Sequence, residues 1–218
     1  MAALMTSVID NPGKVAEYIY SCRQMGIKIL PPDINHVYSS FSVDNGSIRY
    51  GLAAIKSIGR PVIKEIVAER KANGEFKNLK DFIERMSGKD INKRTIENFI
   101  KSGAFDELGG TRKQFMVIYV QILDQVNREK KNSMTGQMSL FDIVGEEQKS
   151  EFDIPLPNVG EYEKSTKLAF EKEVLGIYLS GHPMEEYEEQ WRKGISKTTQ
   201  DFQFDEELGF SRVRDGAT

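Results

Sequence analysis

The chain has 218 residues, of which 39% are hydrophobic and 29% charged, a balance typical of a globular protein with a substantial core. No apolar run approaches the roughly 18 residues that a membrane span needs, and the first residues lack the pattern of a signal peptide. The single cysteine, Cys22, excludes an internal disulfide and is typical of a reducing compartment. We therefore expect a cytoplasmic protein with no membrane partner.

The net charge of −3 conceals an uneven distribution. Residues 52–131 hold 17 Lys and Arg against 11 Asp and Glu, whereas residues 141–218 hold 9 against 18. A basic middle region beside an acidic end suggests a polyanion as the partner of the middle region. A solvated helical surface would have the same composition, so charge alone does not decide between these two readings.

Residues 1–50 predict two helices followed by a small β structure. Apolar side chains recur at helical spacing in "GKVAEYIYSCRQMGI", and Pro12 separates this segment from the helical pattern before it. The residues up to Leu30 precede two prolines, which favours a short extended segment. Asn45 and Gly46 lie between alternating apolar residues and accept the positive φ angles of a tight turn, so we expect a β-hairpin.

After Gly51 the pattern becomes helical. The predicted helices cover residues 51–56, 61–71, 78–86 and 92–103, and a long one runs from 111 to about 130. Thr111 and Gln114 form a capping-box pattern at the start of this long helix. Its apolar residues fall on one stripe, which indicates that a single face packs on a core.

Residues 132–160 have the composition of a linker, because Pro155 and Pro157 oppose regular structure. "EYEKSTKLAFEKEVLGIYLSGHP" predicts another amphipathic helix, which we expect to end at Gly181 and Pro183. The final residues contain strand-like pieces. The predicted fold class is thus mainly α, with a small β-hairpin. We divide the chain into residues 1–50, 51–131, 132–160, 161–195 and 196–218.

No catalytic centre is evident in the sequence. The two histidines, His36 and His182, have no cysteine or carboxylate at a metal-ligand spacing, and His182 lies in a helix-stop sequence that predicts a local structural role. No glycine-rich phosphate loop occurs. We predict no catalytic residue, no metal site and no cofactor for these residues.

Residues 51–70 have the pattern of a helix-hairpin-helix, with a tight turn around Ile58-Gly59. The backbone N–H groups of such a turn and the N-terminus of the next helix present positive potential to a phosphate, and Gly59 leaves room for a DNA backbone. Ser57 stands where many such turns have a glycine, while Ile55 and Ile58 are expected in the core. The residues expected to face DNA are Lys56, Ser57, Ile58, Gly59, Arg60 and Lys64. A helical hairpin used only for packing is the alternative.

A weaker second copy lies within residues 95–115. Its candidate DNA contacts are Lys101, Gly103, Arg112 and Lys113. Arg112 and Lys113 oppose the dipole of the helix that begins there, so helix stability does not explain them. Phosphate contact and plain solvation are both open for these two residues.

The linker carries two large apolar residues, Leu140 and Phe141, three positions after Gln137. Such a Q-x-x-L-F segment can dock as a short linear motif, with the apolar pair in a pocket and the amide making directional hydrogen bonds. The residues of this candidate motif are Gln137, Met138, Ser139, Leu140 and Phe141. Alternatively, Leu140 and Phe141 fold back onto the helices as a small satellite core.

Five sequence segments, taken in their order along the chain, carry a resemblance to a known family that covers nearly all of residues 1–195. They are "MAALMTSVIDNPGKVAEYIYSCRQMGIKILPPDIN", "IRYGLAAIKSIG", "NKRTIENFIKSGAFDELG", "GQMSLF" and "EKEVLGIYLSGHPMEEY". Together they resemble the C-family of bacterial replicative polymerases, the alpha subunits of DNA polymerase III. The resemblance implies that residues 1–50 end a fingers domain and that a helix-hairpin-helix region gripping duplex DNA follows. It further implies an internal motif for the sliding clamp at Gln137–Phe141, then helices that lead toward an incomplete oligonucleotide-binding (OB) fold.

The resemblance also implies what these residues lack. The family's catalytic aspartates, which hold Mg²⁺, belong to a palm domain that would precede Met1, so we expect a non-catalytic fragment of a polymerase. Its implied partners are non-specific duplex DNA, the sliding clamp and other replicase subunits. A stand-alone helix-hairpin-helix module of DNA repair and a structural protein-interaction domain are the rival interpretations.

Overall fold

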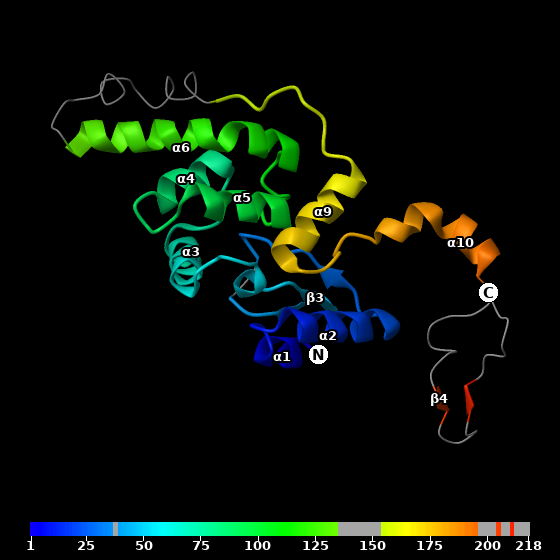
Figure 1. Ribbon diagram of the computed structural model, residues 1–218. Coiled ribbons are helices and arrows are strands. Elements are labelled where there is room, and N and C mark those ends of the chain that lie inside the picture. The colour runs from blue at the N-terminus through cyan, green and yellow to red at the C-terminus, as the bar shows by residue number, and fades with distance from the viewer. Residues whose placement is uncertain (37–38, 135–153, 196–203, 206–209, 212–218) are drawn as a thin grey trace. The chain divides into compact units, whose positions relative to one another are not determined.

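The computed structural model describes residues 1–36, 39–134, 154–195, 204–205 and 210–211 (Figure 1). The chain divides into two compact units, Met1–Ser180 and Gly181–Thr218. The predicted fold class is confirmed in its main features, because helices dominate and the first unit contains one small sheet. The proposed clamp motif at residues 137–141 lies outside the described residues.

Helices α1 (Ala2–Ser7) and α2 (Pro12–Gln24) precede a three-stranded sheet of β1 (Ile29–Leu30), β2 (Ser42–Asp44) and β3 (Ser47–Arg49). The predicted hairpin is confirmed: β2 and β3 are antiparallel, with Val43 opposite Ile48. Asn45 and Gly46 have φ angles of 47° and 79°, as the tight turn requires. The sequence did not indicate that β1 would pair with β3 in parallel.

A 3₁₀ turn, η1 (Leu52–Ala54), replaces the short helix expected at residues 51–56. It leads into α3 (Arg60–Asn73), α4 (Leu79–Met86), α5 (Lys93–Ser102) and α6 (Arg112–Met134). In Figure 1, α6 lies across α4 and α5, and both of these helices contact it. The core between them is rich in aromatic rings. Phe82, Phe99 and Phe105 meet mostly edge to face, with ring centroids 4.9 to 6.1 Å apart, and Phe105 also contacts Phe115.

The start of α6 has the capping box that the sequence predicts. The Gln114 side chain accepts a hydrogen bond from the Thr111 N–H at 2.9 Å, and the Thr111 hydroxyl accepts one from the Gln114 N–H at 3.2 Å. The predicted apolar stripe is buried at Phe115, Ile118, Ile122 and Val126 and half-buried at Tyr119. The local sequence thus determines both where α6 begins and which face it buries.

Helix α9 (Lys164–Leu175) packs against α5 (Figure 1). The predicted end of this helix at residues 181–183 was wrong. Gly176 adopts a left-handed φ of 80° directly after Leu175 and ends the helix there. The carboxylate of Glu171 then accepts hydrogen bonds from the N–H groups of Leu179 and Ser180 at 2.8 and 2.9 Å, which holds the following residues in a non-helical path.

The second unit contains η3 (Pro183–Tyr187), α10 (Glu188–Gly194), and the antiparallel pair β4 (Phe204–Asp205) and β5 (Phe210–Ser211). His182 has the local role that the sequence predicts, because its ring nitrogen Nδ1 accepts the Met184 N–H at 3.1 Å. Among the helices described in either unit, none is long and apolar enough to span a membrane.

Candidate nucleic-acid interface

The turn between η1 and α3 exposes polar groups over a buried apolar base. Ile55 and Ile58 are 2% and 8% exposed, so both predicted core residues are confirmed, and the expectation that the Ile58 side chain also faces DNA is wrong. Lys56, Ser57 and Gly59, between and beside them, are exposed. Ser57 has a φ of 62°, in the left-handed region that glycine adopts without cost. The expected glycine position of the turn therefore has the conformation of a glycine, although a serine occupies it.

The N-terminus of α3 differs from those of the other helices in this region. Asn78, Asn92 and Thr111 cap the starts of α4, α5 and α6 through their side chains. Helix α3 begins after Gly59, which has no side chain, and Pro61 occupies the first turn. Its first N–H groups therefore have no side-chain cap, which is the arrangement that binds an anion at a helix N-terminus.

Three cations surround this helix start. Lys56, Arg60 and Lys64 are all exposed. The Arg60 guanidinium lies 2.7 Å from Asp10, but the two side chains are 62% and 80% exposed. An ion pair as exposed as this one contributes little to stability, so a phosphate could displace Asp10 at little cost.

A fourth cation, Arg94, joins the group from the first turn of α5. Its Nη2 atom lies 3.4 Å from the Ser57 hydroxyl, and the side chain is exposed. The sequence prediction missed Arg94, because it follows Ser57 by 37 residues and belongs to no recognisable hairpin. One signal for Arg94 was available in the sequence. Arg94 directly follows the basic residue Lys93, and the first turn of this helix has no acidic residue.

The second predicted hairpin does not present its cations in the same way. Arg112 is only 4% exposed, and its guanidinium donates to Asp106 at 2.8 Å and to Glu171 of α9 at 3.4 Å. Burial alone would lower the pKa of Arg112, but hydrogen bonds and charge from the two carboxylates outweigh it, so the pKa is raised. The prediction that Arg112 faces either phosphate or solvent is therefore wrong.

The neighbours of Arg112 are also engaged within the protein. Lys101 lies 2.8 Å from Glu97 and 2.9 Å from Glu173, and its pKa is raised because these hydrogen bonds outweigh the opposing effect of burial. Gly103 caps α5 with a φ of 83°, and a Cβ there would lie 2.3 Å from the Arg112 side chain. The close approach of this arginine, rather than of DNA, explains the glycine.

The N-terminus of α6 is likewise covered by a carboxylate of the same chain. The N–H groups of Arg112 and Lys113 donate to Glu161 at 3.4 and 3.3 Å. The Lys113 ammonium lies 5.9 Å from the ring centroid of Tyr162. Carboxylates of the chain itself, three of them within residues 161–173, thus occupy the positions at which we expected phosphates, and the first hairpin is left as the candidate interface.

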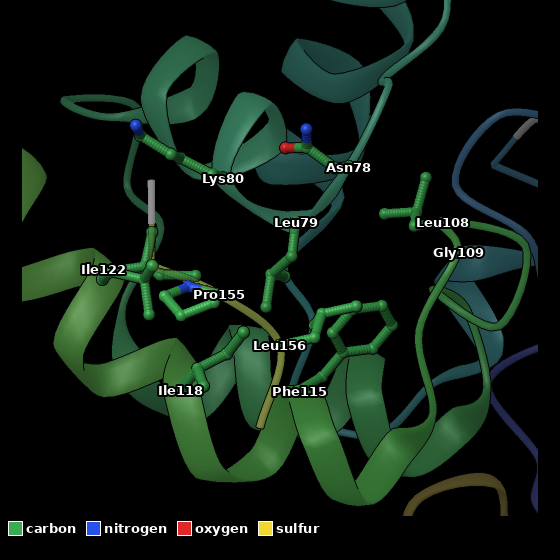
Figure 2. Close-up of a pocket in the computed structure, with 11 residues that line it drawn as sticks. Asn78, Leu79, Lys80, Leu108, Gly109, Phe115, Ile118, Ile122, Pro155 and Leu156 are labelled. Carbon is green, nitrogen blue, oxygen red and sulfur yellow. The ribbon is translucent and has the colours of Figure 1, made fainter. Parts of the chain in front are cut away.

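Residues 154–161 run back along α6 and lie over a pocket between α4 and α6. Figure 2 shows Pro155 and Leu156 across this pocket from Leu79 and Ile118. The Gln114 side chain donates to the Pro157 carbonyl at 3.0 Å and fastens this segment. The lining is largely apolar and has no cluster of titratable groups, so the pocket anchors the chain rather than suggesting catalysis.

No metal site appears among the described residues, where no three His, Cys, Asp or Glu side chains are grouped suitably. The exposed ring of His36 lies 3.0 Å from the buried Asp33, whose carboxylate also accepts backbone N–H groups of the same turn. This pair stabilises a turn.

The exposed turn, the uncapped helix and the clustered cations together define a helix-hairpin-helix protein. In agreement, residues 26–115 match the family model of the helix-hairpin-helix motif. The same residues carry the first hairpin and most of the helices that support it.

Sequence similarities that extend over most of the chain identify its family. The chain is 39% identical over 184 residues to DNA polymerase III subunit alpha of Mycobacterium leprae and 39% identical over 187 residues to that of Borreliella burgdorferi. It is 40% identical over 196 residues to the corresponding subunit of Campylobacter jejuni. The chain therefore belongs to the bacterial DNA polymerase III alpha family, as a homologous segment. These alignments cover 84% to 87% of the chain but only 16% of each relative.

Proposed function

We propose that this chain is a DNA- and clamp-binding segment of a bacterial replicative polymerase. The observation that carries the DNA role is the exposed turn at Lys56–Arg60, which leads into an uncapped α3 inside a helix-hairpin-helix region. A phosphate would accept hydrogen bonds from the first N–H groups of α3, and Lys56, Arg60 and Arg94 would add charge without reading sequence. Nucleotidyl transfer, its Mg²⁺ and contacts to other replicase subunits belong to the whole polymerase under this proposal.

Binding to random-sequence duplex DNA tests the role of the first hairpin. We expect weak, sequence-independent affinity that falls steeply as salt increases, since phosphate contacts release counterions. The double variant Lys56→Gln/Arg60→Gln should make the slope of log affinity against log salt less negative by about 2, because each lost phosphate contact removes about 0.9 from its magnitude.

A matched control lies on the same helix and the loop that follows it. Lys71 and Lys77 are exposed, and Lys71 lies about 16 Å from Arg60 along the axis of α3. Lys71→Gln/Lys77→Gln removes the same charge, and we expect it to leave the slope nearly unchanged. Failure of the wild-type chain to bind duplex even at low salt would refute the DNA role and favour a structural interaction domain.

The clamp role concerns Gln137–Phe141 and rests on homology and on the sequence of the motif. A segment that is tethered between α6 and residues 154–161 would join the polymerase to a ring around the same duplex. Two weak contacts to linked partners raise the effective concentration of each, which would increase processivity. A stand-alone repair module would not need such a segment, and similarity to alpha subunits over 84% of the chain argues against that rival.

A peptide of residues 134–144 tests this role in isolation. We expect it to bind a bacterial sliding clamp, and Leu140→Ala/Phe141→Ala should weaken binding by about 30-fold or more, since truncation of a hot-spot residue costs about 2 kcal/mol. Ile143→Ala/Val144→Ala removes similar apolar area just outside the motif and should have a small effect. Equal affinity of the wild-type and Leu140→Ala/Phe141→Ala peptides would defeat the assignment.

A further inference from the structure

The exposed turn of the first hairpin is fastened on both sides of Lys56. The Lys56 N–H donates to the carbonyl of Val174 in α9 at 2.8 Å. The Lys56 carbonyl accepts a hydrogen bond from the side-chain amide of Asn98 in α5 at 2.9 Å. Asn98 is 7% exposed, which is unusual for a residue of this kind unless its polar atoms are used. Two helices distant in sequence therefore fix the peptide groups that enter the turn.

The contact with α9 uses atoms that a helix leaves unpaired. Val174 and Leu175 are the last residues of α9, so their carbonyls have no donor within the helix. The Lys56 N–H bonds to the first of these carbonyls, and the buried Tyr50 hydroxyl donates to the second at 3.1 Å. The hairpin thus caps α9, and α9 in turn holds the hairpin. Helix α9 lies outside the 26–115 match to the helix-hairpin-helix model.

The next residue explains why such support is needed. Ser57 has a left-handed φ of 62°, which costs a residue with a side chain about 1–2 kcal/mol. The turn's own hydrogen bond, from the Ile58 N–H to the Ile55 carbonyl, is long at 3.4 Å. A conformation of this cost persists only where the surroundings impose it.

We infer that Asn98 and the last turn of α9 are positioning elements that hold residues 56–59 in the conformation that binds a phosphate. This inference rests on the proposed DNA role of the first hairpin. Neither element touches DNA. Each increases the fraction of molecules in which the turn is ready to bind. Because the observed affinity is proportional to that fraction, loss of either element would lower the affinity. The functional helix-hairpin-helix unit accordingly extends to α9, beyond the proposed clamp segment.

Asn98→Ala in the full chain tests the inference. We expect duplex affinity to fall about 5- to 10-fold at every salt concentration with the salt slope unchanged, because the competent fraction falls while the bound state keeps its phosphate contacts. Asn98→Leu keeps a similar side-chain size and adds no charge but cannot donate to the Lys56 carbonyl, and it should behave alike. Ser102→Ala is the matched control: Ser102 is fully buried on the same helix, but its hydroxyl bonds only to the Phe99 carbonyl. This control should bind DNA as the wild type does.

Rescue separates positioning from general destabilisation. Glycine adopts the left-handed conformation freely, so a turn with Ser57→Gly depends less on its support. Asn98→Ala/Ser57→Gly should bind within about twofold of Ser57→Gly alone, at a temperature where thermal melts show every variant folded. Hydrogen exchange of the Lys56 amide should be slow in the wild type and faster in Asn98→Ala.

The outcomes distinguish this inference from the proposed function. Wild-type binding together with unchanged affinity in both Asn98 variants would overturn the positioning role alone, and so would a salt slope that falls with the affinity, because it would indicate a lost phosphate contact. Absence of rescue by Ser57→Gly would overturn it as well. Absence of wild-type binding would remove the DNA role, and the positioning role with it.

Discussion

Replacement of Arg112 by leucine should destabilise the first unit far more than an ordinary surface substitution does. The Arg112 side chain is 5% exposed and bridges Asp106 on its own segment to Glu171 of α9. Leucine would leave the Glu171 carboxylate, itself 1% exposed, without its opposite charge. Removal of one partner of a buried ion pair costs about 3–5 kcal/mol, because an uncompensated charge stays in the interior.

The partner substitution should cost less. Glu171→Gln removes the charge but keeps an oxygen that can accept the Leu179 and Ser180 N–H groups. A hydrogen bond to a charged acceptor contributes about 1.5–3 kcal/mol and a neutral one about 0.5–1.5 kcal/mol. For the two hydrogen bonds from Leu179 and Ser180, a loss of roughly 2 kcal/mol is therefore expected. The double variant should be more stable than the sum of the two losses implies, with a coupling of about 1–3 kcal/mol.

Urea unfolding followed by far-ultraviolet circular dichroism would measure these differences, since helices of the first unit dominate the signal. Lys113→Leu is the control, because the ammonium of Lys113 makes only a 5.9 Å contact with the Tyr162 ring and should matter by less than about 1 kcal/mol. An Arg112→Leu variant within about 1 kcal/mol of wild type, or strict additivity in the double variant, would refute the assignment of Arg112 to a buried structural pair.

Two further predictions concern stability. Ser57→Gly should stabilise the chain by about 0.5–1 kcal/mol, since relief of the left-handed strain outweighs the extra freedom of glycine in the unfolded state. Ser47→Gly in β3 should instead destabilise it. A denaturation series in which both variants change stability in the same direction would contradict this reasoning. Hydrogen bonds from Lys89, Asn73 and Arg85 lower the pKa of Glu69 from 4.5 to about 2. The resulting stability is complete above about pH 4.5 and is lost as the pH falls toward 2, so Glu69→Gln should flatten the acid limb of a pH–stability curve, and an unchanged limb would count against the network.

The features that the sequence predicted well are those that a few neighbouring residues determine. Asn45-Gly46 sets its own hairpin, and Thr111 with Gln114 caps α6 through atoms three residues apart. The buried stripe of α6 follows from helical spacing alone. Ile55 and Ile58 were also assigned correctly, because a short turn that exposes the residues between them must bury both.

The wrong predictions about charged residues depended on partners far along the chain. Nothing near Arg112 indicates that Glu171, 59 residues later, would remove it from solvent. The early end of α9 has a local origin instead, since Gly176 adopts the left-handed conformation directly after Leu175. Arg94 escaped notice because only folding brings it to Ser57. The basic composition of residues 52–131 therefore overstated the exposed positive charge, because carboxylates from the acidic region neutralise part of it.

The hydrogen bond from Tyr50 to the carbonyl of Leu175 has a consequence for the order in which the protein forms. The two residues are 125 positions apart. At roughly 5–20 residues per second, Leu175 is synthesised about 6–25 seconds after Tyr50. Contacts among α4, α5 and α6 are local in sequence and form much faster than that. We therefore expect a nascent chain to complete its helical core first and to acquire the finished hairpin turn only when α9 arrives.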